Sequence, residues 1–286
     1  MPGGCCHRWA ICVRPRVCRN IAPSMTDLPQ LNDIRRHLDA LDDQLLDILR
    51  QRAELIQKVR PLKPSGQLHI RAGREAEMFR RLFSRPQGHL PPQLVYAVWR
   101  NMIGSFTAQE ENFVVAAVPE TALCAHQNFG LMPEITVYET TSALWQTTEK
   151  ARLWDVALLP TPADGQAAWW ADLKHHRDYK IFMSLPLVAG MTPPAWVVGK
   201  IQPEETGDDV AVMVIAAQKK VDAAAIINKG GQVLVEKVDH EGGKTLFLWK
   251  NLAEGRNLAI PAFHDLLHQH GAQLHYLGGF ALPVQL

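Results

Sequence analysis

The stretch Ile34–Val59, IRRHLDALDDQLLDILRQRAELIQKV, decides the expected fold of the N-terminal part of the chain. Its apolar residues recur at alternating steps of four and three, which is the period of one face of an α-helix. The stripe consists of Ile34, Leu38, Leu41, Leu45, Ile48, Leu55 and Val59. The spacing predicts one long amphipathic helix over residues 28–63, ended by Pro64, Ser65 and Gly66.

One step of this stripe is polar, because the position that should be apolar carries Arg52. A cation on a buried face is costly unless an anion meets it, although its stem can also pack while the guanidinium reaches water. Lys63 follows eleven residues later on nearly the same face, about 16 Å away along the axis. The two cations could hold a small dianion. Arg35 lies seventeen residues before Arg52, about 25 Å away and on another face, so one straight helix cannot bring both to one small ligand.

Two shorter helices are expected over residues 74–83 and from Pro92 to about Glu111. Three helices with short connections bury little surface alone, which predicts a partner chain. Taken singly, the polar residues on these two helices are typical of a solvated surface. Those of interest are Arg74 and Glu75, and the i, i+4 pair Ser105 and Gln109.

The pattern changes after residue 112. Strand and helix segments alternate over residues 113–203, which predicts a middle α/β domain with a parallel sheet. Beyond the polar turn Pro203–Asp209, the order βαββαβ predicts a ferredoxin-like domain over residues 204–286. The expected fold is therefore multidomain: an α domain over residues 25–112, followed by α/β and α+β parts.

The composition excludes several classes of protein. With 286 residues, 47% apolar and 21% charged, and a net charge of +1, the chain is globular and lacks a large electrostatic footprint for nucleic acid. No apolar run is long enough to span a membrane. Four of the five cysteines lie before residue 20, and Cys124 alone lies in the body, which predicts a reducing, cytoplasmic setting. Residues 1–24 are Arg-rich without acidic residues, and we expect a disordered extension with Met25 as a plausible start; a targeting peptide is the alternative.

The segment Leu31–Gln109 resembles the all-helical chorismate mutases. The resemblance rests on the stretch quoted above, on Leu62-Lys63, on REAEMFRRL (residues 74–82) and on WRNMIGSFTAQ (residues 99–109). It implies a three-helix domain in an intertwined homodimer with shared active sites. It also implies conversion of chorismate to prephenate without metal or cofactor. The positions that match the family's site are Arg35, Arg52, Lys63, Arg74, Glu75, Ser105 and Gln109.

The resemblance also assigns a role to each side chain. Arg35, entering from the other subunit, and Arg52 would hold the two carboxylates of chorismate. Lys63 and Gln109 would donate hydrogen bonds to the ether oxygen as negative charge develops on it. Glu75 would accept the ring hydroxyl. The polar wall would be completed by Arg74 and Ser105. Two departures from the family pattern are Arg71, where an acidic residue is common, and Pro61 near the end of the long helix.

The remainder is similar to the prephenate dehydratase region and ACT-type regulatory domain of bifunctional enzymes. The similarity rests on AHQNFG (residues 125–130), WDVALLP (residues 154–160) and YLGGFALP (residues 276–283). The region is short for a dehydratase, the nearest match to its Thr-Arg-Phe signature is Thr206-Gly207-Asp208, and Glu236 is the one candidate effector residue. The scattered histidines favour surface positions over a metal site. Two alternatives stay open: a bifunctional mutase and dehydratase, and a non-catalytic sensor of an aromatic metabolite.

Overall fold

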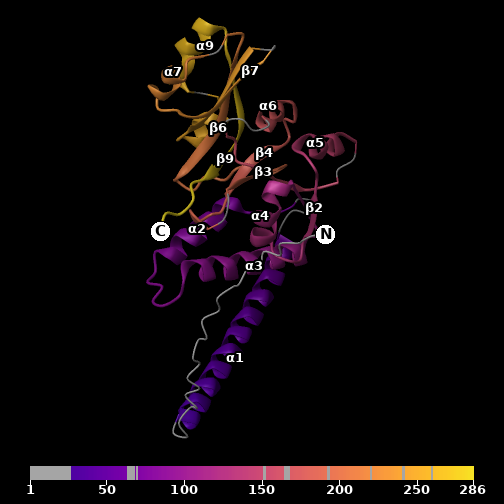
Figure 1. Cartoon of the computed structure of the whole chain (residues 1–286), viewed down its shortest axis with the longest axis vertical. Coiled ribbons are helices and arrows are strands. Elements are labelled where there is room, and N and C mark those ends of the chain that lie inside the picture. The colour runs from indigo at the N-terminus through magenta and orange to yellow at the C-terminus, as the bar shows by residue number, and fades with distance from the viewer. Residues whose placement is uncertain are drawn as a thin grey trace, which may run out of the picture. The chain divides into compact units, whose positions relative to one another are not determined.

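The computed structural model describes residues 27–62, 68, 70–150, 153–163, 168–191, 194–219, 221–239, 242–258 and 260–286 (Figure 1). The chain divides into two compact units, Met1–Leu55 and Ile56–Leu286. The extension expected at residues 1–24 and the expected site residue Lys63 lie outside the described residues.

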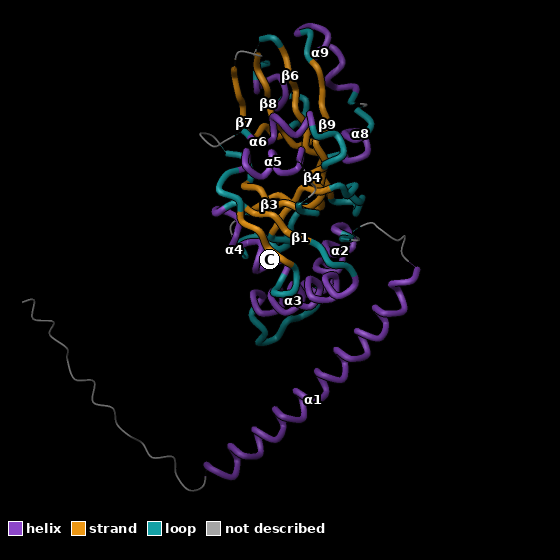
Figure 2. The backbone as a smooth tube through the Cα atoms, turned by 90° about the vertical axis from the view of Figure 1, so that its right-hand side faces the viewer, coloured by secondary structure: helices purple, strands orange, loops and turns teal. Residues whose placement is uncertain are grey.

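Helix α1 spans Asp27–Val59 as one uninterrupted rod (Figure 2). It ends at Val59 rather than at residue 63, and a short 3-10 turn, η1 (Arg60–Leu62), follows. Pro61 explains the earlier end, because proline has no N–H to donate and disfavours the α conformation at the residue before it. The apolar stripe of α1 is exposed along its length. Its exposed members are Ile34, Leu38, Leu41, Leu45, Ile48, Leu55 and Val59.

Helices α2 (Ala72–Phe83) and α3 (Pro92–Glu110) follow, close to their expected bounds. Pro92 lies in the first turn of α3, where a missing N–H costs nothing. The rings of Phe79 on α2 and Tyr96 on α3 pack with centroids 5.0 Å apart. Both helices contribute to one hydrophobic core together with strands of the sheet described next.

The first five strands form one half of a mixed sheet. They are β1 (Val114–Ala117), β2 (Glu134–Val137), β3 (Val156–Pro160), β4 (Lys180–Leu185) and β5 (Ala195–Gly199). β1 runs parallel to β2 and β3, as expected, but β5 is antiparallel to both β3 and β4. The expectation of a parallel sheet was therefore only partly right. The segment between β4 and β5 is too short for the crossover that a parallel pair requires, so the chain reverses instead.

Helices cover both faces of these strands. Helices α2, α3 and α4 (Pro119–Phe129) share a core with one face of β1, β3 and β5. Helices α5 (Thr141–Lys150) and α6 (Trp169–Asp172) pack against the other face, and α6 continues into η2 (Leu173–His175). Figure 1 shows α4 and α5 beside the strands between them.

The C-terminal segment carries four more strands. They are β6 (Asp209–Ala217), β7 (Gln232–Asp239), β8 (Gly242–Trp249) and β9 (Gln273–Ala281). Their order in the sheet is β9-β6-β8-β7, and each neighbouring pair is antiparallel. The connecting helices are α7 (Ala223–Ile227), α8 (Leu252–Arg256), η3 (Pro261–Phe263) and α9 (His264–His270). The sequence pattern did not predict α8.

All nine strands belong to one sheet, of order β2-β1-β3-β5-β4-β9-β6-β8-β7. β4 and β9 join its two halves through a single register pair, Ile181 with Gly278. Gly278 has φ 142°, and a Cβ there would lie 2.1 Å from the carbonyl oxygen of Ile181, so glycine permits this close approach of the two backbones.

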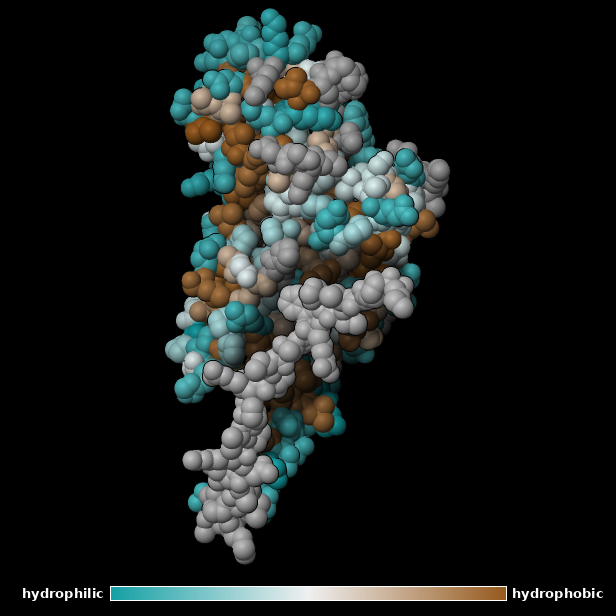
Figure 3. Space-filling view, in the orientation of Figure 1, coloured by the Kyte–Doolittle hydropathy of each residue, from teal (hydrophilic) through white to brown (hydrophobic). Residues whose placement is uncertain are grey.

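The surface over α9 is hydrophilic (Figure 3). His264, His268 and His270 are exposed there, as the sequence favoured. Among the described residues, no three of His, Cys, Asp and Glu lie close enough together to hold a metal ion. Every helix in the described ranges is too short or too polar to span a lipid bilayer.

Candidate functional site

The expected site residues are divided between the two units of the chain. Arg35 and Arg52 lie on α1 in the unit that ends at Leu55, where Arg35 is exposed and Arg52 is half-buried. The seventeen residues between them correspond to about 25 Å along the helix axis. Since α1 is uninterrupted, these two guanidinium groups cannot meet one small ligand from the same copy of the helix.

Glu75 and Arg74 stand next to each other on α2 in the second unit. The carboxylate of Glu75 is buried and accepts a hydrogen bond from the guanidinium of Arg100 on α3. Arg74 is exposed, and its backbone N–H donates to Glu204 Oε2 at 3.3 Å. The expected hydroxyl acceptor, Glu75, is thus held in a buried ion pair that the sequence did not reveal.

Arg100 is 1% exposed, and its hydrogen bonds are to the buried residues Glu75 and Asn128. Besides the pair with Glu75, its Nε and Nη2 donate to the carbonyl oxygen of Asn128 at 2.9 and 2.7 Å. Burial is the largest single influence and disfavours the charged form, but the charge and hydrogen bond of Glu75, together with Tyr96 and Cys124, outweigh it and raise the pKa of Arg100 above its usual value.

A polar network extends from this pair into α4 and the segment after β4. The hydroxyl of Tyr96 donates to the side-chain oxygen of Asn128 and accepts the N–H of Leu187 at 3.1 Å. Asn128 also donates to the carbonyl oxygen of Cys124 at 2.8 Å. Because each of these groups has a partner, the network orients α2, α3 and α4 relative to one another.

The first turn of α2 is capped by a distant carboxylate. Glu204 Oε2 accepts the N–H of Gly73 at 3.0 Å, and its other oxygen pairs with the side chain of Arg71. An anion at a helix N-terminus satisfies free N–H groups and meets the positive end of the helix dipole. Arg71, which departs from the family pattern, therefore has a structural partner here.

Ser105 and Gln109 lie one turn apart on α3, Ser105 half-buried and Gln109 exposed. The neighbouring Gly104 faces α4, where a Cβ would lie 2.1 Å from the carbonyl oxygen of Phe129. Glycine at this position lets α3 approach α4 closely. The close packing fixes the rotation of α3 and hence the direction of the Ser105 and Gln109 face.

The turn that offered the nearest match to a dehydratase signature is engaged in structural contacts. The Thr206 hydroxyl donates to Asp209 Oδ1 at 2.6 Å and accepts from Arg80 Nη1 at 2.7 Å. The N–H groups of Thr206 and Gly207 donate to Asp209 Oδ2 at 2.6 and 2.9 Å. These contacts give the Thr206 hydroxyl both a donor and an acceptor within the protein.

Two residues of this region, Arg100 and Glu204, were not predicted from the sequence. A signal for Arg100 existed, since it interrupts the buried i, i+4 row of Tyr96, Gly104 and Ala108 on α3 just as Arg52 interrupts the stripe of α1. Nothing local marked Glu204, whose partners on α2 lie about 130 residues away.

A comparison with known protein families finds a match for the helical segment of this chain. Residues 34–111 match the chorismate mutase type II family. This confirms the resemblance drawn from residues 31–109. All the expected site residues fall inside the matched span, including those that lie on separate units.

A relative matches over a longer stretch. The bifunctional chorismate mutase/prephenate dehydratase of Aquifex aeolicus (strain VF5) is 24% identical over 165 residues, which are 54% of this chain and 45% of that relative. The matched stretch thus spans less than half of the relative's length.

Two solved structures align with TM-scores of 0.41 and 0.42. The prephenate dehydratase from Streptococcus mutans is 12% identical, with 61% of this chain and 100% of that chain covered. The prephenate dehydratase in complex with L-Phe from Arthrobacter aurescens is 9% identical, with 59% and 89% covered.

Proposed function

We propose that the chain is a chorismate mutase that converts chorismate to prephenate. The observation that carries the proposal is the match of residues 34–111 to the chorismate mutase type II family, which includes every charged and polar position expected to touch the substrate. The reaction is a rearrangement within one molecule, so it requires binding and orientation rather than a nucleophile. Such an enzyme would act in the reducing cytoplasm that the cysteine distribution predicts.

In this proposal the cations select one conformation of a dicarboxylate. Arg52 and Arg35 each bind a carboxylate through charge-assisted hydrogen bonds. Lys63 and Gln109 donate to the ether oxygen as the C–O bond stretches, which stabilises the transition state more than the ground state. Glu75 accepts a hydrogen bond from the ring hydroxyl. Arg74 and Ser105 complete the polar wall.

Arg100 adds a positioning role to this scheme. An ionised carboxylate has about four lone-pair directions, so Glu75 can accept a substrate hydroxyl while one oxygen stays bound to Arg100. Because Arg100 is itself fixed to Asn128, it would hold the Glu75 side chain in one orientation. We therefore assign Arg100 the role of a positioning residue.

The proposal also requires a second copy of the chain. Arg35 and Arg52 are too far apart on α1 to share one substrate, so Arg35 must serve the site of a partner. The exposed apolar stripe of α1 gives the partner a surface to cover, and burying it would supply the core that three helices lack alone. We therefore expect a homodimer with two shared sites.

The second half of the chain supports a second candidate, a bifunctional mutase and dehydratase. The match to the Aquifex aeolicus enzyme runs over 165 residues, more than the span 34–111 can supply, so it extends into the mixed sheet. The β9-β6-β8-β7 order, antiparallel throughout, supports a ferredoxin-like, ACT-type tail over residues 204–286. The middle part, over residues 113–203, would be the dehydratase-like region.

One assay separates these candidates. The purified full chain is incubated with chorismate, and both prephenate and phenylpyruvate are followed over time. Prephenate alone supports a mutase, and prephenate followed by phenylpyruvate supports the bifunctional enzyme. If chorismate is not consumed, the proposal is wrong.

A further inference from the structure

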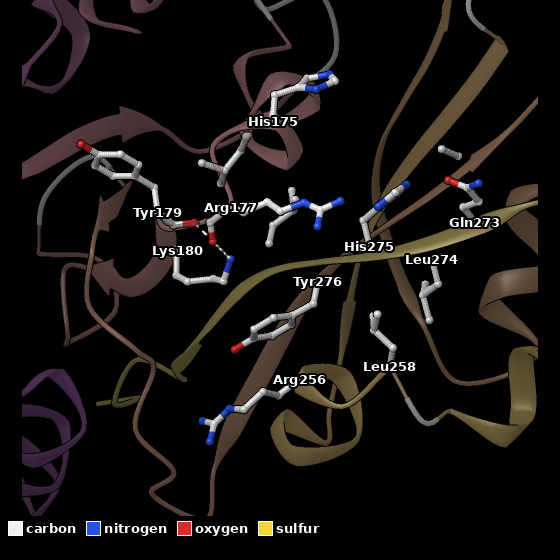
Figure 4. A pocket seen from close by; sticks show the side chains of 13 residues that line it. His175, Arg177, Tyr179, Lys180, Arg256, Leu258, Gln273, Leu274, His275 and Tyr276 are labelled. Carbon is white, nitrogen blue, oxygen red and sulfur yellow. Dashed lines mark hydrogen bonds between the residues drawn. The ribbon is translucent and has the colours of Figure 1, made fainter. Parts of the chain in front are cut away.

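A cavity of about 610 Å³ opens beside β9, and none of the residues assigned to the mutase lines it. β9 pairs with β6 along its whole length but with β4 only at Gly278. Residues 273–277 therefore line the cavity where β4 has turned away from β9 (Figure 4). Leu277 is an extra residue in the register with β6, between Val212 and Met213, and a bulge of this kind often adjoins a functional site.

The polar lining of this cavity is cationic. Arg177, Lys180 and Arg256 line it together with His175 and His275, and none of the described lining residues is acidic. The nearby carboxylates stand outside the lining and have partners. Asp178 pairs with Lys200 at 3.7 Å, and Glu205 pairs with Arg256 at 3.5 Å.

The three cationic side chains differ in the hydrogen-bond partners that they already have within the protein. Arg256 donates to the carbonyl oxygen of Pro203 at 2.7 Å, and Lys180 donates to that of Arg177 at 2.6 Å. In contrast, the guanidinium of Arg177 makes no hydrogen bond or ion pair with a described residue. Figure 4 shows it extending from the turn before β4 into the cavity, toward His275 on β9. Its planar set of donors suits a carboxylate, which it can bind through two parallel hydrogen bonds.

The environment of Lys180 also favours an anion. Burial is the main cause that lowers the pKa of Lys180, and the nearby charge of Arg177 lowers it further, against an opposing effect of Asp178. A negative charge between Lys180 and Arg177 would favour the charged form of Lys180 and so offset both effects.

The remaining walls are apolar or aromatic. They consist of Leu173, Tyr179, Leu258, Leu274, Tyr276 and Leu277. The Tyr276 hydroxyl is buried, and burial raises its pKa against the opposing effect of the nearby Arg256. Cavities of about 300–1,000 Å³ that combine apolar walls with a few polar groups are typical of small-molecule sites.

We propose that this cavity binds a small organic carboxylate with an apolar body, its carboxylate on Arg177 and its body against the leucine and tyrosine walls. The inference concerns a site outside residues 34–111 and does not depend on mutase activity.

Titration calorimetry on the full chain tests the proposal with three probes: 3-phenylpropanoate, the neutral 3-phenylpropanamide of the same size, and inorganic phosphate. We expect 3-phenylpropanoate to bind at least about tenfold more tightly than the amide, which lacks the charge, and than phosphate, which lacks the apolar body. Equal affinities for acid and amide, phosphate binding as tightly as the acid, or no binding of the acid at millimolar concentration would overturn it.

Variants locate the binding. Arg177→Gln should weaken 3-phenylpropanoate binding about tenfold or more, and Arg177→Lys should restore part of it, because it keeps the charge but not the paired donors. Arg52→Gln is the matched control, since the mutase site also attracts carboxylates and should not account for this binding. Mutase activity should be unchanged in Arg177→Gln. Affinity lost in Arg52→Gln but kept in a folded Arg177→Gln would place the ligand elsewhere and refute the proposal.

Discussion

The carboxylate of Glu75 on α2 and the guanidinium of Arg100 on α3 form an ion pair in the interior of the second unit, where Arg100 is 1% exposed. A buried charge is tolerated only with a partner and satisfied hydrogen bonds, and Asn128 supplies the rest of these. The pair therefore links a residue of the expected mutase site to the packing of α2, α3 and α4.

Replacing Arg100 should cost stability. Arg100→Met leaves Glu75 as an unpaired buried carboxylate, and we expect the free energy of unfolding to fall by about 3–5 kcal/mol. Urea unfolding, followed by circular dichroism, measures it. The double variant Glu75→Leu/Arg100→Met should recover much of the loss, because no charge is left behind. The control Arg50→Met removes an exposed pair with Asp47 and should change stability by less than about 1 kcal/mol. Similar values for Arg100→Met and Arg50→Met would show that the pair is not buried in solution.

Alkaline pH should weaken the same region through Tyr96. Burial raises the pKa of Tyr96 from its usual 10.0 to about 12. Between these two pH values the unfolded chain binds fewer protons than the folded one. The contribution of Tyr96 to the free energy of unfolding is therefore fully present below pH 10 and is lost as pH rises toward 12. The loss from this residue should approach about 2–3 kcal/mol. Measured from pH 8 to 11.5, the unfolding free energy of Tyr96→Phe should start lower but decline less steeply. Parallel curves for the two proteins would exclude Tyr96 as the source.

Gln109 should act by donating a hydrogen bond. An ionised carboxylate cannot donate, so Gln109→Glu should be nearly inactive at neutral pH and should recover as pH falls through the pKa of the introduced carboxyl group. Gln109→Ala should lose about 10²–10³-fold in turnover at every pH. Gln109 is exposed in the described structure, and an ordinary surface glutamine would give little change in either variant. Flat, near wild-type rates of Gln109→Glu from pH 4.5 to 8 would remove Gln109 from the site, and Ser105 with it.

Shared active sites can be tested by complementation. Arg35→Ala and Arg52→Ala chains should each be inactive, but mixing them should restore activity, because one site of each hybrid dimer contains both guanidinium groups. The readout is the rate of prephenate formation after subunit exchange, with exchange itself proved by mass spectrometry. Full exchange without recovery would mean that Arg35 and Arg52 do not belong to sites shared between chains.

Local patterns predicted the elements better than their assembly. The long helix α1 and the strand and helix bounds of the second unit follow from the periods and runs of apolar residues, which the sequence displays directly. The antiparallel insertion of β5 and the joining of β4 to β9 at Gly278 depend on contacts between distant segments. No local pattern contains that information.

The site was predicted unevenly for the same reason. Arg52 and Glu75 were found because they stand at defined spacings within matched helices. Arg100 was not predicted, although it lies in a row of α3 whose other residues are buried. Glu204 was not predictable, because its contacts with α2 arise only when the loop before β6 reaches that helix.

The most direct test of the central claim compares two arginines on the same helix. Prephenate formation from chorismate is measured for the full chain, for Arg52→Gln and for the matched control Arg50→Gln, each with and without excess chelator. We expect chelator-independent turnover by the wild type and by Arg50→Gln. For Arg52→Gln we expect a loss of about 10²-fold or more in kcat/KM, because a misplaced carboxylate leaves the reactive conformation. A folded wild-type chain that leaves chorismate unchanged, or an Arg52→Gln variant as active as Arg50→Gln, would contradict it.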